Sequence, residues 1–284
     1  MSVVAFGFNL DVQKSENNTT ILKNPESNIF INRNSILIGD KIGSGSYSLI
    51  YLGFYNDLSL HVAVKTETSL KLTLKQIKKM LKLSHENLIK FYGVCPLDNS
   101  EHLIIMELAS PKGSLRKFID DAPFRIKLST KLNWLKQIAY GMQYLHYNEI
   151  THRDLKADNI VFDKYPENFH ELESVKLKII DISTMYGTPT HMSPEAFEDC
   201  YNFKSDVWSF GCLAWEIMTQ FNLKEYFKQI SIFELSLQKT GMKLSDIDFK
   251  PIKDLIEICW EKDTDLRPSF SDILIMLDKI NSEE

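Results

Sequence analysis

The chain has 284 residues, 44% of them hydrophobic and 25% charged, and a formal net charge of -5 at pH 7. Such a composition is typical of a folded globular protein and argues against a largely disordered chain. The acidic balance provides no broad basic surface, which argues against nucleic-acid binding. The 4 cysteines are widely separated, and no stretch of about 18 apolar residues occurs. The sequence therefore predicts an intracellular, cytoplasmic protein that is not inserted in a membrane.

Residues 1–35 are polar and irregular, which predicts an N-terminal extension without readable chemistry. From residue 36 the apolar and β-branched residues fall into short runs separated by glycine or Asn-Asp turns. These runs predict a small antiparallel sheet. The predicted strands read SILIGDKIG, LIYLGFY and LHVAVKT, and then, after an intervening helix, LIKFYGV and HLIIMEL.

The intervening helix is predicted to be amphipathic, since Leu70, Leu74, Ile77 and Leu81 recur at steps of three and four residues. A group of lysines crowds the same segment. Because they alternate with leucines at helical spacing, they are predicted to form a solvated helix face: Lys71, Lys75, Lys78, Lys79 and Lys82.

The sequence after Gly113 is predicted to be mainly helical. The nearly all-apolar run VWSFGCLAWEIM is long enough for a buried helix. A second predicted helix places one apolar face toward the core: Leu132, Leu135, Ile138, Met142 and Leu145. A sheet followed by helices indicates an α+β fold, and such an order often places a ligand cleft between the two parts.

The first chemical signal is the small-residue run GSGSYS, from Gly43 to Ser48, between the first two predicted strands. Small residues let backbone N–H groups approach phosphate oxygens, although such a run alone is more often a hairpin without a ligand. The next strand carries VAVK, which ends at Lys65. A lysine fixed on a strand under the loop can pair with phosphates, so the two features together favour a phosphate site.

The second signal is the segment HRDLKADN, from His152 to Asn159, followed by Asp-Ile-Ser at 181 and Ser-Pro-Glu at 193. Each member alone has a structural explanation as a core histidine, a surface aspartate or a helix cap. Together and in this order they are the signature set of protein kinases. The chain resembles that superfamily from about Ile36 to Ile280. Segments such as HENLIKFYGV and SDVWSFGCLAWEI point to the tyrosine-kinase-like group of serine/threonine kinases.

The resemblance implies a protein-kinase-like bilobal fold for residues 36–282. Its N-lobe, a small antiparallel sheet with one main helix, would span about 36–106. The hinge would span about 107–110, and a larger helical C-lobe about 111–282. The resemblance also implies ATP and Mg²⁺ as cofactors and a protein with serine or threonine hydroxyls as substrate. It leaves the oligomeric state open.

By this resemblance, Asp154 orients and deprotonates the substrate hydroxyl, Lys156 screens the charge of the moving phosphoryl group, and Lys65 pairs with the phosphates. Asn159 and Asp181 would hold Mg²⁺. The implied ATP-site residues are Ile42, Gly43, Ser44, Gly45, Ser46, Ser48, Ile50, Ala63, Lys65, Met106, Glu107 and Val161.

The resemblance extends to residues with structural roles. Asp206, in SDVWSFG, would anchor a helix, and Glu195 would pair with Arg267 to tie the helical lobe together. Gly187 and Thr188, which precede the run MSPE, match the loop on the substrate side of the cleft.

Three features depart from the family pattern. Gln76 stands where a glutamate ordinarily pairs with the strand lysine, so we expect it to accept only a hydrogen bond from Lys65. Ile182 and Ser183 replace the phenylalanine and glycine that ordinarily follow the metal-binding aspartate. Only three residues then separate Ser183 from Gly187. We therefore expect little control of activity by phosphorylation of that short loop.

Two functions follow from these residues. An active serine/threonine kinase is favoured because all four polar catalytic residues are present: Lys65, Asp154, Asn159 and Asp181. The alternative is a pseudokinase, an ATP-binding or nucleotide-free scaffold or switch with weak or no phosphotransfer. It rests on Gln76, on the Asp-Ile-Ser motif and on the short loop.

Overall fold

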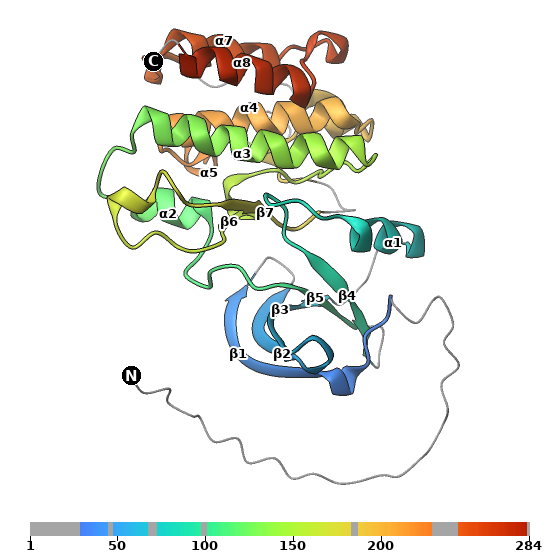
Figure 1. Ribbon diagram of the computed structural model, residues 1–284. Helices are drawn as coiled ribbons and strands as arrows, with labels where there is room; N and C mark the ends of the chain where they lie inside the picture. The colour runs from blue at the N-terminus through green and yellow to red at the C-terminus, as the bar shows by residue number, and fades with distance from the viewer. Residues whose placement is uncertain are drawn as a thin grey trace, which may run out of the picture.

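The structure of the protein, a computed structural model, describes residues 29–44, 48–67, 73–97, 101–182, 187–228 and 244–282. A curled β-sheet with one helix forms one lobe, and a larger lobe of helices lies beside it (Figure 1). This arrangement confirms the predicted α+β fold with two lobes. Within the described ranges, no helix is both long enough and apolar enough to cross a bilayer.

The sheet of the N-lobe has five antiparallel strands in the order β1-β2-β3-β5-β4. Val62 and Val64 on the central strand are fully buried with Ile105 of β5. The predicted strand LIKFYGV starts later than expected, because Leu88 instead bridges Ile179 of the other lobe. The strands are β1 Ile36–Ser44, β2 Leu49–Tyr55, β3 Leu60–Glu67, β4 Phe91–Pro96 and β5 His102–Glu107.

The single helix of the N-lobe, α1, spans Leu74–Lys82 and packs beside β4. It begins at a capping box, in which Thr73 and Gln76 satisfy each other's backbone N–H groups. Ile77 is its buried residue and belongs to a small apolar cluster with β4. Leu74, predicted to face the core, is 48% exposed, and Leu70 lies outside the described residues.

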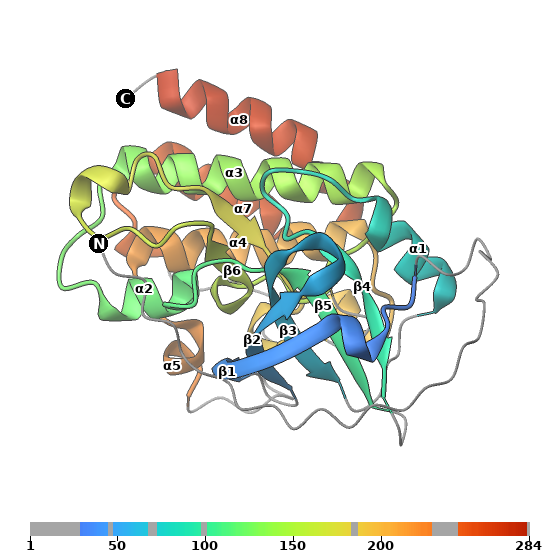
Figure 2. The ribbon, with the colours of Figure 1, turned by 60° about the horizontal axis from the view of Figure 1, so that its bottom comes forward.

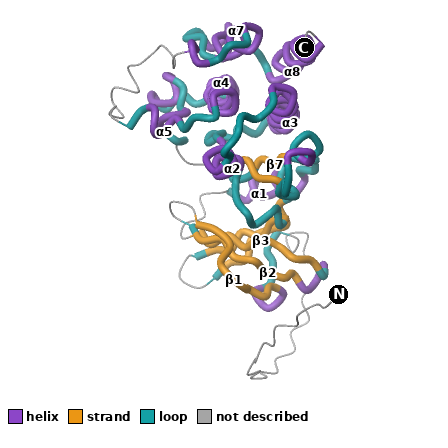
Figure 3. The backbone as a smooth tube through the Cα atoms, turned by 90° about the vertical axis from the view of Figure 1, so that its left-hand side faces the viewer, coloured by secondary structure: helices purple, strands orange, loops and turns teal. Residues whose placement is uncertain are grey.

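The C-lobe is organised around α3 and α4, which lie side by side at its centre, with α7 and α8 outside them (Figures 1 and 3). A two-stranded hairpin, β6 and β7, faces the N-lobe. Its elements are α2 Leu115–Asp121, α3 Leu128–Tyr147, β6 Ile160–Phe162, β7 Leu177–Ile179, α4 Phe203–Thr219, α5 Leu223–Tyr226, α7 Lys250–Cys259 and α8 Phe270–Ser282.

The core of the C-lobe follows the predicted helix faces. Trp134 of α3 and Trp215 of α4 are among its largest fully buried side chains. The predicted apolar face of α3 is confirmed, because each of these residues is 0% exposed: Leu132, Leu135, Ile138, Met142 and Leu145. α4 is buried along nearly its whole length, as its apolar run predicts.

Backbone hydrogen bonds join the two lobes at the hairpin. The N–H of Ile89 donates to the carbonyl of Ile179 at 2.9 Å. The N–H of Ser110 donates to the carbonyl of Phe162 at 3.0 Å. Since these bonds tie the two strands of the hairpin to the segment that enters β4 and to the segment that leaves β5, β6 and β7 are held directly against the N-lobe (Figure 2).

Within the C-lobe, Arg267 and Glu195 form the ion pair that the sequence predicts. Arg267, whose side chain is 0% exposed, donates two hydrogen bonds to the carboxylate of Glu195, at 2.7 and 2.9 Å. Burial raises the pKa of Glu195, but these bonds and those from Ser193 and Ser205 outweigh it, so that the pKa falls to about 2. The carboxylate therefore stays charged over the whole neutral range.

Glu195→Gln is expected to lower the free energy of unfolding at neutral pH by on the order of 3 kcal/mol, because Arg267 loses its anionic partner. The folded-state pKa of about 2 lies below the ordinary 4.5. The stability that Glu195 contributes is therefore present above about pH 4.5 and is lost toward pH 2. Urea denaturation should show that the difference in the free energy of unfolding between wild type and Glu195→Gln narrows as the pH falls through this range. The exposed neighbour variant Glu198→Gln serves as control, and a pH-independent gap would contradict the assignment.

Candidate active site

The register of the sheet gathers the predicted ATP-site residues of the N-lobe. Ile50 on β2 lies opposite Lys65 on β3, and Ala63 lies opposite Met106 on β5. Gly43, near the end of β1, pairs with Ile50. These residues therefore share one face of the sheet.

Three further predicted ATP-site residues of the N-lobe are described: Ile42 and Ser44 at the end of β1, and Ser48 just before β2. Gly45 and Ser46 lie outside the described residues. From the C-lobe, Val161 is the central residue of β6 and bridges Ser114 at the start of α2. The hairpin thus supplies the opposite wall of the predicted site.

Glu107 ends β5, where the sequence places the start of the hinge. Its carboxylate accepts a hydrogen bond from the backbone N–H of Lys90 at 3.0 Å and forms an ion pair with Lys178, also at 3.0 Å. Because the side chain is engaged by protein groups, any contact of Glu107 with a nucleotide is left to its backbone.

The loop 152–159 follows α3 and is fixed by α4 beneath it. The backbone N–H groups of His152 and Arg153 each donate to the carboxylate of Asp206 at 2.9 Å. Arg153 adopts a left-handed backbone with φ of 70°. That conformation is uncommon for a residue with a side chain and persists only where the surroundings hold it. The loop is therefore a rigid platform.

Asp154 is at the centre of a polar cluster on this platform. One carboxylate oxygen accepts from the N–H and the hydroxyl of Thr188, at 2.9 and 2.7 Å. The other accepts from the amide of Asn159 at 2.9 Å and pairs with Lys156 at 2.7 Å. Burial raises the pKa of Asp154, but the Lys156 ammonium and these hydrogen bonds outweigh it and hold the pKa below its ordinary value. The carboxylate is ionised and fixed in direction.

The sequence places Thr188 only on the loop at the substrate side of the cleft, and its contacts within this cluster were not predicted. Its hydroxyl lies 2.7 Å from Asp154 and accepts a hydrogen bond from Lys156 at 2.5 Å, so it joins the two predicted catalytic residues. Gly187 is the sequence feature that could have indicated this contact. A side chain at that position would collide with the carbonyl oxygen of Arg153, so only glycine lets the chain approach the loop so closely.

The predicted metal ligands lie where β7 returns to the loop. The N–H of Ile180 donates to the carbonyl of Asn159 at 2.9 Å, which brings the adjacent Asp181 to the same place. Asn159 uses its amide nitrogen on Asp154, which leaves its amide oxygen for a cation. Mg²⁺ prefers oxygen ligands, so the amide of Asn159 and the carboxylate of Asp181 fit it chemically.

Lys65 of the N-lobe forms its ion pair with Asp181 of the C-lobe. The hydrogen bond expected between Lys65 and Gln76 is absent from these two described side chains. The oxygen of Gln76 instead accepts from the N–H and the hydroxyl of Thr73, at 2.9 and 2.8 Å. The expectation was wrong because the first turn of α1 has unsatisfied N–H groups that Gln76 helps to cap.

The predicted short loop begins after Ile182, which packs against the apolar core of the C-lobe. Ser183, Thr184, Met185 and Tyr186 lie outside the described residues. Arg153, the expected docking group for a loop phosphate, lies over the ring of Tyr201 at 5.6 Å and donates to the hydroxyl of Thr151 at 3.3 Å. The guanidinium of Arg153 is therefore held by Tyr201 and Thr151, without a phosphorylated residue of the loop.

With this geometry in place, comparison with known proteins identifies the family. A model described as protein tyrosine and serine/threonine kinase matches residues 36–277. The chain belongs to this family, and its relatives are of the tyrosine-kinase-like type, as the motifs indicated.

Three relatives illustrate the similarity. The chain is 31% identical, over 89% of its length, to serine/threonine-protein kinase STY46 of Arabidopsis thaliana, of which it covers 45%. It is 28% identical, over 95% of its length, to dual specificity protein kinase shkA of Dictyostelium discoideum, of which it covers 53%. It is 31% identical, over 88% of its length, to a mitogen-activated protein kinase kinase kinase of Drosophila melanogaster, of which it covers 23%. The chain thus spans about half or less of these curated relatives.

The capping role of Gln76 can be tested with Gln76→Glu. A carboxylate in the first turn interacts favourably with the helix dipole, so the free energy of unfolding should rise by about 0.3–1 kcal/mol. The same increment is expected in a Lys65→Gln background, because the two side chains do not touch. Denaturant titration of the four proteins measures both increments. An increment that vanishes without Lys65 would show that residue 76 pairs with Lys65 within the N-lobe.

Proposed function

We propose that this protein transfers the γ-phosphate of ATP to serine or threonine hydroxyls of protein substrates. The observation that carries the proposal is the cluster of Asp154, Lys156 and Thr188, in which a fixed carboxylate and a fixed cation lie side by side. The membership in the protein kinase family supports it. Protein kinases use ATP and Mg²⁺, and residues 36–282 would form the kinase domain.

In this mechanism Asp154 orients the substrate hydroxyl and accepts its proton, which then leaves to solvent. A carboxylate with a lowered pKa is a weak base. It is sufficient here because the phosphoryl transition state is loose and needs little deprotonation of the nucleophile before transfer. Thr188 and Lys156 limit the rotation of the carboxylate, so the reaction gains from positioning.

The two lysines and Mg²⁺ would stabilise the negative charge of the phosphoryl group during its transfer. Lys156 lies next to Asp154 and would neutralise charge on the transferred group. Lys65 would pair with the phosphates at the opposite side of the cleft, and Asp181 with Asn159 would hold Mg²⁺. When bound, Mg²⁺ supplies charge neutralisation on the phosphate oxygens. The nucleotide would lie against Ile42, Gly43, Ser44, Gly45, Ser46, Ser48, Ile50, Ala63, Met106, Glu107 and Val161.

The preference for serine and threonine rests on Lys156, which stands two residues after Asp154 as in serine/threonine kinases. Its contact with Thr188 narrows the space beside the carboxylate. One of the relatives named above, shkA, carries dual specificity in its name, so tyrosine is the competing acceptor. Matched peptides that differ only in serine, threonine or tyrosine distinguish these specificities.

The alternative function is a pseudokinase, and one observation favours it: Gln76 caps its own helix and does not hold Lys65. We favour the kinase, because Lys65 still has a carboxylate partner in Asp181 and the cluster around Asp154 is complete. The two functions differ in whether bound nucleotide is turned over.

Asp154→Asn is expected to reduce phosphotransfer by about 100-fold or more and to leave ATP binding intact, since proton acceptance and orientation are lost. Thr188→Val should impair turnover as well, whereas Thr188→Ser keeps the hydroxyl and serves as its control. Radiolabelled phosphate transfer to a generic serine/threonine substrate and fluorescence titration with ATP measure the two quantities. Nucleotide binding without turnover above the Asp154→Asn background would establish the pseudokinase.

A further inference from the structure

The outer face of α1 is strongly basic. Lys75, Lys78, Lys79 and Lys82 are spaced three and four residues apart, so they lie on one face of the helix, opposite the buried Ile77. We call these four residues the lysine face. Lys79 pairs with Glu149 at 3.1 Å. Within the described part of the chain, the other three form no ion pair, and all three are exposed.

The lysine face opposes helix formation. Like charges three and four residues apart destabilise a helix by about 0.2–0.5 kcal/mol per pair, and α1 contains no acidic residue to offset them. Lys75 also lies in the first turn, where the helix dipole favours a negative group. Apart from the ion pair of Lys79 with Glu149 and the favourable place of Lys79 and Lys82 in the last turn, these charges are not offset within α1, and their arrangement suits an anionic partner.

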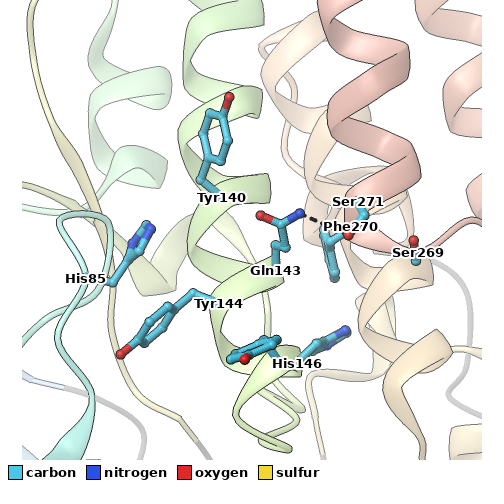
Figure 4. Close-up of a pocket in the computed structure, with 9 residues that line it drawn as sticks. His85, Tyr140, Gln143, Tyr144, His146, Ser269, Phe270 and Ser271 are labelled. Atoms are coloured by element: carbon cyan, nitrogen blue, oxygen red, sulfur yellow. Dashed lines mark hydrogen bonds between the residues drawn. The ribbon is translucent and has the colours of Figure 1, made fainter.

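A pocket of about 370 Å³ lies between α3, the start of α8 and the loop that follows α1. Figure 4 shows His85 facing Tyr144 of α3, with Gln143 donating to Ser271 at the start of α8. Two tyrosines at this surface are exposed, Tyr140 at 43% and Tyr147 at 86%. The lining consists of His85, Tyr140, Gln143, Tyr144, His146, Tyr147, Ser269, Phe270 and Ser271. Such a wall suits an aromatic side chain.

The lysine face and the pocket adjoin each other. The backbone N–H of Ser84, two residues beyond the end of α1, donates to the hydroxyl of Tyr144 in the pocket wall at 3.2 Å. The ion pair between Lys79 and Glu149 ties α1 to the chain two residues beyond Tyr147. One extended ligand can therefore contact both.

We propose that the lysine face and this pocket together bind an acidic polypeptide segment that carries an aromatic side chain. The carboxylates would pair with the lysines, and the aromatic ring would enter the pocket. A peptide fits better than a membrane or a nucleic acid, because the lysines span only about 10 Å. The carboxylate of Glu149 lies beside them, in a chain of net charge -5. A broad lattice of phosphates would meet this carboxylate too. The binding does not depend on phosphotransfer.

The probe is a fluorescein-labelled, glutamate-rich peptide of about twelve residues with one phenylalanine, long enough when extended to span both features. Fluorescence anisotropy at low salt measures its Kd. Replacing three lysines by glutamine should weaken binding at least about fivefold, since several exposed ion pairs are removed. The variant is Lys75→Gln, Lys78→Gln and Lys82→Gln, and the matched control removes the same charge elsewhere: Lys41→Gln, Lys164→Gln and Lys262→Gln. Unfolding temperatures verify that both remain folded.

The pocket is tested separately with Tyr147→Ala, a change at an exposed residue, and with a peptide whose phenylalanine is alanine. Each change should weaken binding, and the two together should weaken it no more than one alone, because they remove the same contact. Equal weakening by the two triple variants, or equal affinity for the two peptides, would overturn the proposal. So would lysine-dependent binding of phosphatidylserine vesicles or a single-stranded oligonucleotide in the absence of peptide binding.

Discussion

The carboxylate of Asp206 is 0% exposed and accepts hydrogen bonds from four groups. These are the backbone N–H groups of His152 and Arg153, the hydroxyl of Tyr201 and a ring nitrogen of His146. Burial raises the pKa of Asp206, but these partners, with His146 foremost, hold it below its ordinary value. A buried charge is tolerated only with such partners. Asp206 belongs to α4, which is packed in the core of the C-lobe, so its hydrogen bonds fix the loop that carries Asp154 to that core.

The two walls of the cleft are consequently held in different ways. On the C-lobe side, Asp154 is fixed by Thr188, Lys156 and Asn159, all of them tied to the platform that Asp206 anchors. On the N-lobe side, among the residues that the structure describes, the ammonium of Lys65 is paired with Asp181, a residue of the C-lobe, and α1 contributes no polar contact to it. The position of the Lys65 ammonium therefore depends on the approach of the lobes and not on the helix beside it.

The sequence predicted the features that depend on local pattern or on motif. The strand β3, the apolar face of α3 and the pair of Glu195 with Arg267 belong to this class. The prediction from sequence failed where one side chain could make either of two local contacts. Gln76 has the spacing to face Lys65, yet it also lies at the third position of a helix whose N–H groups need acceptors. The contact of Thr188 with Asp154 was missed because it spans 34 residues, and no spacing rule relates the two positions.

The same helix connects these observations with the outer surface. α1 is short, and a helix of this length owes its stability to its cap and to tertiary packing. Here the packing consists of Ile77 with the partly buried Met80 and Leu81, and the cap uses Gln76. Among the described residues, the lysines contribute one ion pair, that of Lys79 with Glu149. An anion on the lysine face would remove the mutual repulsion of these charges. Since Lys79 already pairs with Glu149 beyond α3, a bound acidic segment would change the balance of charge at the one described ion pair between α1 and the C-lobe.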